Sequence, residues 1–201
     1  MQGYYNYIVK VEERYLNETE EGLIVNTEIS ERDYMFVNRI GTIVATPLLE
    51  IYDSIEPGDE VIVHHNVFRT YYDIRGNLKN GSAFLEDNLF KVEPELIYAY
   101  RKPGQYWKAI DGFCFVEPIN DDSKWGQGEK SLQGTLVIDN EETKKLGLKI
   151  GDVVGFTSDS EYEFTIEGDR MYRVHTQSLN LLYHECEGKK TTNNQELSQS
   201  A

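Results

Sequence analysis

The sequence predicts an all-β protein that contains two tandem copies of one unit. Short runs rich in valine, isoleucine, tyrosine and phenylalanine are separated by glycine, asparagine and proline turns along the 201 residues. Apolar residues at helical spacing are scarce, which argues against a helical core. Several short blocks also occur twice in the same order, which is the usual sign of an internal repeat.

The repeated blocks share both composition and spacing. Residues 41–45 (Gly-Thr-Ile-Val-Ala) are mirrored by residues 134–138 (Gly-Thr-Leu-Val-Ile), and the turn at 55–61 is mirrored by the turn at 148–154. The first glycine of each block precedes the glycine of the matching turn by 17 residues in both copies. Because the blocks occur in the same order and with the same spacing, duplication of one unit is favoured over chance matching of short motifs.

The strands of the first unit are predicted from alternating apolar residues and from the turns between them. Residues 4–15 alternate in a way that indicates a strand with one buried face. Pro47 ends the strand over residues 40–46, because proline removes a donor from the ladder. Pro57 and Gly58 suit the two corners of a type II turn, and the second corner needs a positive φ. Further strands are expected over residues 61–63, 70–74, 83–92 and 96–100.

The second unit repeats this pattern with fewer residues. Strands are expected over residues 110–118, 134–138, 171–174 and 179–183, a polar loop over 120–133, and one helical turn over 141–146. The predicted domains are residues 1–100, with a long loop, and residues 106–186, joined by a linker over 101–105. The polar segment 187–201 is expected to be a disordered tail.

An apolar triplet in the first unit is the main functional signal. Leu23, Ile24 and Val25 follow Gly22 inside an acidic, polar segment, and no apolar residue alternates with them before Ile29. Two interpretations stay open, namely an ordinary core strand and an exposed apolar segment that a partner covers. Apolar side chains that a loop carries into water are costly unless something buries them, so the central hypothesis is a partner protein.

Together, these motifs resemble a tandem form of the GroES-type co-chaperonins, the chaperonin-10 family. Residues 6–10 resemble the opening strand of that family, residues 22–25 its mobile-loop motif, residues 39–45 the strand that leaves the loop, and residues 58–61 its Gly-Asp-x-Val turn. The resemblance covers residues 5–184, although the second copy lacks the docking triplet. It implies two partly open β-barrels with structural turn residues at Gly41, Gly58, Asp59, Gly134, Gly151 and Asp152.

The resemblance also implies a function. A lid of this family binds a GroEL-type chaperonin through its mobile loop, here Gly22, Leu23, Ile24 and Val25, and encloses an unfolded client. The lid needs no cofactor, because the partner chaperonin binds the ATP. The expected assembly is a homo-oligomer of seven chains, with the second repeat stacked above the first. Residues 46–56 are too short for the family's roof hairpin, and similar changes in phage-encoded lids suggest such an origin.

Composition excludes several other partners. The net charge of −15 argues against nucleic acid, because a phosphate-binding face needs clustered lysine and arginine. No apolar run approaches the ~18 residues that span a membrane, and no signal peptide is visible at the start, so the expected compartment is the cytoplasm. Cys114 lies in an apolar run and is interpreted as a buried small hydrophobe, and no CxxC pair indicates zinc.

No enzyme is expected, although the sequence contains four histidines. His64 and His65 would point to opposite faces of a strand and could not share a ligand, and His175 and His184 lie on other segments. All four are interpreted as surface or strand-packing residues. Two alternatives to the lid stay open: a structural tandem β-barrel protein of a virion, and a lid-like inhibitor of the host chaperonin.

Overall fold

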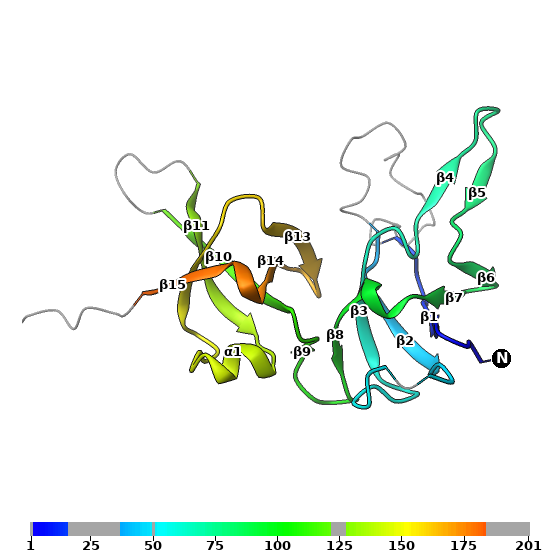
Figure 1. Cartoon of the computed structure of the whole chain (residues 1–201). Helices are drawn as coiled ribbons and strands as arrows, with labels where there is room; N and C mark the ends of the chain where they lie inside the picture. Colours follow the sequence, from blue (N-terminus) through cyan, green and yellow to red (C-terminus); the bar gives the residue numbers. More distant parts are fainter. Residues whose placement is uncertain (1, 16–36, 50, 122–127, 184–201) are drawn as a thin grey trace, which may run out of the picture.

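The first sheet contains the strands of the first repeat in an open, antiparallel arrangement. The computed structural model describes residues 2–15, 37–49, 51–121 and 128–183 (Figure 1). The strand order is β6-β7-β1-β2-β3-β8-β9, so β6 and β9 lie at the two edges of this sheet. The bounds are β1 (Tyr7–Lys10), β2 (Ile40–Ala45), β3 (Glu60–Val63), β6 (Phe84–Glu86), β7 (Leu89–Val92), β8 (Ile97–Arg101) and β9 (Lys108–Ala109).

The second sheet contains the second repeat and has the order β13-β14-β10-β11-β12-β15. Its strands are β10 (Phe113–Asn120), β11 (Glu129–Ile138), β12 (Val153–Phe156), β13 (Glu161–Ile166), β14 (Asp169–His175) and β15 (Leu179–Tyr183). A short helix α1 (Glu141–Lys145) follows β11, and 3-10 turns precede β8 (Pro94–Leu96) and β15 (Thr176–Ser178). A separate hairpin, β4 (Thr70–Tyr72) and β5 (Leu78–Asn80), projects from the first repeat (Figure 1).

The two sheets confirm the all-β, tandem prediction. Strands β6, β7, β1, β2, β3 and β8 follow one another in the same order as β13, β14, β10, β11, β12 and β15. Irregularities in register also recur, between Ile62 and Val63 in one copy and between Gly155 and Phe156 in the other. Neither sheet closes into a complete barrel, because its two edge strands pair on one side only among the described residues.

The Gly-Asp turns have the same geometry in both repeats. Gly58 and Gly151 both have φ of 96°, a left-handed backbone that glycine adopts without strain. The Asp59 carboxylate accepts the backbone N–H of Glu56 at 2.9 Å, and the Asp152 carboxylate accepts that of Lys149 at 2.8 Å. The turn therefore fixes how β3 and β12 enter their sheets.

Two of the expected turn residues lie in strands instead. Gly41 is inside β2 and Gly134 is inside β11. A Cβ built on Gly134 would lie 2.8 Å from the Cβ of Val116, and one built on Gly41 would lie 2.5 Å from Val9 Cγ1. These glycines are needed for close approach of neighbouring strands, not for a turn.

Other boundaries differ from the expected ones for local reasons. The single strand expected over residues 83–92 is a hairpin, because Asp87 takes a positive φ of 48° between β6 and β7. The polar loop expected over 120–133 is shorter, since β10 and β11 extend to pair Asn120 with Glu129. The expected linker 101–105 begins with the last residue of β8 and then turns into β9, which pairs with β8. The tail 187–201 lies outside the described residues.

Three apolar clusters hold the fold together. One fills the first repeat and includes Val9, Val61 and Phe90, and another fills the second repeat and includes Leu136 and Val154. The third joins Ile62, Tyr98 and Ala99 of the first repeat to Phe115, Ile138, Phe164, Ile166 and Met171 of the second. The repeats are thus packed against each other through a buried apolar interface.

Candidate partner-docking site

The chain departs from the first barrel after Tyr15 and returns at Val37. These two residues form an antiparallel bridge, and Val37 is fully buried in the core of the first repeat. The four residues expected to bind a chaperonin, Gly22, Leu23, Ile24 and Val25, lie between them and outside the described residues. The structure therefore defines the root of the segment, at Tyr15 and Val37.

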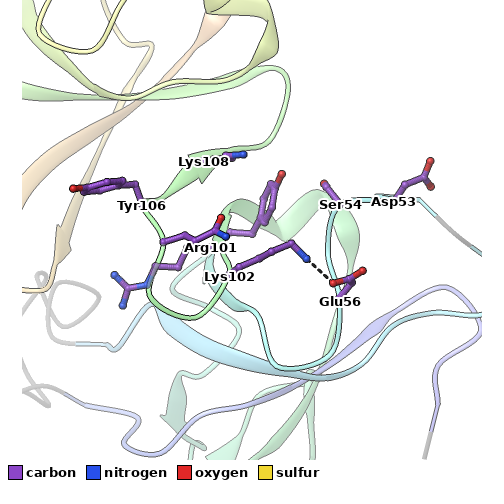
Figure 2. A pocket seen from close by; sticks show the side chains of 9 residues that line it. Asp53, Ser54, Glu56, Arg101, Lys102, Tyr106 and Lys108 are labelled. Atoms are coloured by element: carbon purple, nitrogen blue, oxygen red, sulfur yellow. Dashed lines mark hydrogen bonds and ion pairs between the residues drawn. The ribbon is translucent and has the colours of Figure 1, made fainter.

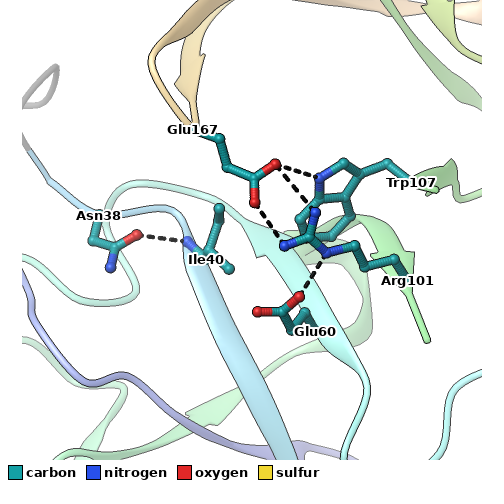
Figure 3. Close-up of polar contacts among 6 residues, drawn as sticks. All are labelled: Asn38, Ile40, Glu60, Arg101, Trp107 and Glu167. Carbon is teal, nitrogen blue, oxygen red and sulfur yellow. Dashed lines mark hydrogen bonds and ion pairs between the residues drawn. The ribbon is translucent and has the colours of Figure 1, made fainter. Parts of the chain in front are cut away.

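Backbone and side-chain hydrogen bonds hold this root together. The backbone N–H of Asn38 donates to the carbonyl oxygen of Arg14 at 2.8 Å, and the Asn38 side-chain amide donates to the carbonyl oxygen of Glu13 at 2.8 Å. The Asn38 side-chain oxygen accepts the N–H of Ile40 at 2.9 Å (Figure 3). Both arms of the segment are thus fixed where they meet the barrel.

The root is also tied to the projecting hairpin. The hydroxyl of Tyr15 lies 2.8 Å from the hydroxyl of Thr70 at the start of β4, and it accepts the backbone N–H of Thr70 at 3.0 Å. Arg14 donates to the side-chain oxygen of Asn80, the last residue of β5, at 2.6 Å. The base of the hairpin and the root of the segment therefore form one connected unit.

Arg14 is held further by aromatic packing. Its guanidinium carbon lies 4.8 Å from the ring centroid of Phe84 and 4.9 Å from that of Phe90. Burial lowers the pKa of Arg14 from its ordinary value, but arginine stays charged throughout the working pH range. The side chain thus positions the root through stacking and hydrogen bonds.

The hairpin presents apolar side chains to solvent. Exposed apolar residues on or beside its two strands are Tyr71, Tyr72, Ile74 and Leu78. The Asp73 carboxylate accepts the backbone N–H groups of Arg75 at 2.8 Å and Asn77 at 2.9 Å, and these bonds from Asn77 and Arg75 lower its pKa. The sequence contained a sign of this hairpin, namely the Gly76-Asn77 turn, but not its contact with the root.

His64 and His65 do not lie on opposite faces of a strand, as the sequence analysis expected. They follow β3 in a turn, and their ring centroids are 4.1 Å apart. The His65 ring also stacks on Tyr162 of the second repeat, with centroids 5.8 Å apart and a hydrogen bond between the two side chains. Burial and the neighbouring His64 and Arg39 charges lower the pKa of His65 to about 3. His65 is therefore a neutral packing residue between the repeats.

Charged residues also link the two repeats at the edge of the same interface. The Arg101 guanidinium donates to Glu60 of the first repeat at 2.6 Å and to both carboxylate oxygens of Glu167 of the second repeat, at 2.6 and 3.1 Å (Figure 3). It also stacks on the Trp107 ring at 4.3 Å. The hydrogen bonds from Arg101 lower the pKa of Glu167 and keep it charged.

An open pocket of about 340 Å³ lies beside the turn between β8 and β9. Lys102 pairs with Glu56 inside it, while Tyr106 and Lys108 border it (Figure 2). The pair is exposed to solvent, and ion pairs of this kind contribute little to stability. In the part of the chain that the structure describes, no cluster of three or more histidine, cysteine, aspartate or glutamate residues can hold a metal ion.

The structure also tests the prediction that Cys114 is buried. Cys114 is fully buried, as expected, and burial raises the pKa of its thiol to about 12. Cys186 and His184 lie outside the described residues.

Within the described residues, the five-residue helix α1 is far too short to cross a membrane. Neither a scan of protein-family models nor a search of curated proteins found a match to this chain.

Proposed function

We propose that this protein is a co-chaperonin, a lid that binds a GroEL-type chaperonin through residues 22–25 and assists folding of an enclosed client. The observation that carries the proposal is the root formed by Tyr15 and Val37. An all-β repeat holds both ends of one segment at a single bonded site, and the sequence of that segment contains a glycine followed by three aliphatic residues. The four blocks that resemble the chaperonin-10 family support the same assignment.

The energetics favour binding that is weak for one loop and stronger for several. Burying Leu23, Ile24 and Val25 in an apolar groove of the partner contributes about 1.5–3 kcal/mol for each side chain. Ordering the backbone opposes this by about 1–2 kcal/mol per residue fixed. A homo-oligomer, expected to be a heptamer, presents several such segments, and later contacts become intramolecular. The lid can then bind firmly and still leave when the chaperonin changes state.

Co-elution with a GroEL-type chaperonin in the presence of nucleotide tests this proposal. We expect the wild-type chain to migrate with the chaperonin, and the double variant Leu23→Ser with Ile24→Ser to migrate alone. The matched control is Leu146→Ser with Ile150→Ser, because both side chains are aliphatic and exposed on the second repeat. Wild-type chain that elutes alone, or equal binding by the loop variant, would refute the proposal.

Refolding of a stringent client then separates a helper from an inhibitor. A lid that closes the chamber raises the yield of folded client above that of the chaperonin alone. A chain that binds but lowers the yield occupies the docking grooves without completing the cycle. A chain that does not bind at all favours the structural, virion role that the sequence left open.

A further inference from the structure

One face of the projecting β4–β5 hairpin continues outward from the root of residues 16–36 (Figure 1). In the register of the hairpin, Thr70 pairs with Asn80, and Tyr72 pairs with Leu78. Paired residues of an antiparallel ladder share a face, and so do residues that are two apart on one strand. These four side chains therefore lie on one face of the hairpin, which we call the root face.

The inner half of the root face contacts the residues that precede the segment. Thr70 bonds the hydroxyl of Tyr15, and Asn80 accepts a hydrogen bond from Arg14. The returning arm reaches the same place, because Val37 is bridged to Tyr15. The chain therefore leaves the first barrel and returns to it at the base of the root face.

The outer half of the root face is apolar and half-exposed. Tyr72 is 47% exposed, and Leu78 is 57% exposed. Among the described residues, β4 and β5 pair only with each other and form a separate two-stranded sheet. A hairpin of two strands is marginally stable in water, so apolar side chains that cover one of its faces stabilise it.

The returning arm of the segment supplies apolar side chains at the right place in the chain. Residues 34–36 are tyrosine, methionine and phenylalanine, and they directly precede Val37. Three residues span at most about 10 Å of chain, whereas Thr70 and Tyr72 are about 7 Å apart along β4. Methionine and aromatic side chains pack well against other aromatic and aliphatic groups. Residues 34–36 therefore match the root face in both reach and chemistry.

Charge favours the same occupant. Residues 69–81 contain three basic residues and one acidic residue, so the formal charge of the hairpin is +2. Residues 16–36 contain six acidic residues and one arginine, so the formal charge of the segment is −5. The root holds these two oppositely charged parts together at their bases, within the distance of about 10 Å over which salt leaves such attraction effective.

We propose that residues 34–36 dock on the root face of their own chain, with their apolar side chains packed against Tyr72 and Leu78. The hairpin then supports the base of residues 16–36 at a fixed place on the first repeat. The proposal does not rest on the co-chaperonin function, because both contacting parts belong to the free chain.

Docking of residues 34–36 leaves the apolar triplet at residues 23–25 available to a partner. From Thr70 to Ile74, β4 and the start of its turn extend about 13 Å. The outgoing residues 16–22 span up to about 23 Å, and the returning residues 26–33 span up to about 26 Å. The triplet therefore reaches beyond the tip of the hairpin while the returning arm stays docked.

Hydrogen–deuterium exchange of the full chain, with no partner protein present, tests the proposal. The matched variants are Tyr72→Thr and Tyr71→Thr, because these neighbouring tyrosines are 47% and 52% exposed but lie on opposite faces of β4. Leu78→Thr is a second root-face variant. Threonine is favoured in strands, and the exchange of the β4 and β5 amides checks that the hairpin is kept.

The amides of residues 34–36 should exchange about tenfold faster in Tyr72→Thr and in Leu78→Thr than in the wild type, and at the wild-type rate in Tyr71→Thr. Nuclear Overhauser effects between the side chains of residues 34–36 and the Tyr72 ring, expected in the wild type, give a measurement that needs no variant. Equal exchange in all variants, or the absence of these effects, would overturn the proposal. Protection that grows with protein concentration would also overturn it, because a second copy would then be the occupant.

Discussion

Replacing Phe164 by alanine tests whether the two repeats are one cooperative unit. The Phe164 side chain is completely buried, and its ring centroid lies 5.8 Å from that of Tyr98 and 5.5 Å from that of Phe115. The Arg39 guanidinium carbon lies 4.4 Å from the same ring. Because Tyr98 belongs to the first repeat and Phe164 to the second, the substitution opens a cavity between the repeats. Buried phenylalanine-to-alanine changes cost about 3–5 kcal/mol.

The assay is urea unfolding followed by circular dichroism. With a slope of about 2–3 kcal/mol per molar urea, the midpoint of Phe164→Ala should fall by about 1–2.5 M. Phe164→Leu keeps most of the apolar surface, so its loss should be below about 1.5 kcal/mol. Leu146→Ala is the surface control, because Leu146 is 65% exposed, and its change should stay within about 0.5 kcal/mol. A midpoint for Phe164→Ala that equals the surface control would refute the packed interface.

Three further substitutions test other parts of the structure. Because the pKa of His65 is lowered to about 3 in the fold, its contribution to stability is complete above pH 6.5 and is lost as the pH falls toward 3. The unfolding free energy should therefore decrease below pH 6.5, by at most about 1.4 kcal/mol per pH unit for this group. His65→Phe should flatten this dependence of the unfolding free energy on pH, and an unchanged dependence would contradict the assignment. Gly134→Ala should cost about 1–3 kcal/mol in thermal unfolding, because its Cβ would clash with Val116; a neutral effect would show that the strands can separate freely. Tyr15→Phe should lose about 0.5–1.5 kcal/mol, since the hydroxyl no longer bonds Thr70, and amide exchange at Thr70 should accelerate; unaltered exchange would show that this bond does not hold the hairpin.

The sequence predicted the parts of the fold that local chemistry determines. The sequence predicted a turn with positive φ at Gly58 and a matching turn at Gly151, and both glycines have φ of 96°. The hydrogen bonds that the Asp59 and Asp152 carboxylates add to these turns were not predicted. Alternation of apolar residues likewise identified the strands that line each core. These signals depend only on neighbours in the chain.

The interface between the repeats was missed because its signal is not local. Ile62 lies in an expected strand, but no strand was expected over Glu161–Ile166, which carries Phe164. Neither local pattern says that these two side chains meet. The same holds for His64 and His65, whose interpretation assumed an extended strand where the chain already turns. The contact of the hairpin with Tyr15 joins residues 55 positions apart, which periodicity cannot detect.

The most direct test of the account is hydrogen–deuterium exchange over residues 22–25, measured with and without a GroEL-type chaperonin and nucleotide. We predict that the amides of Leu23, Ile24 and Val25 exchange markedly more slowly in the mixture, while those of the Leu146–Ile150 control region keep their rates. Equal exchange at the triplet with and without the chaperonin would contradict the proposed docking.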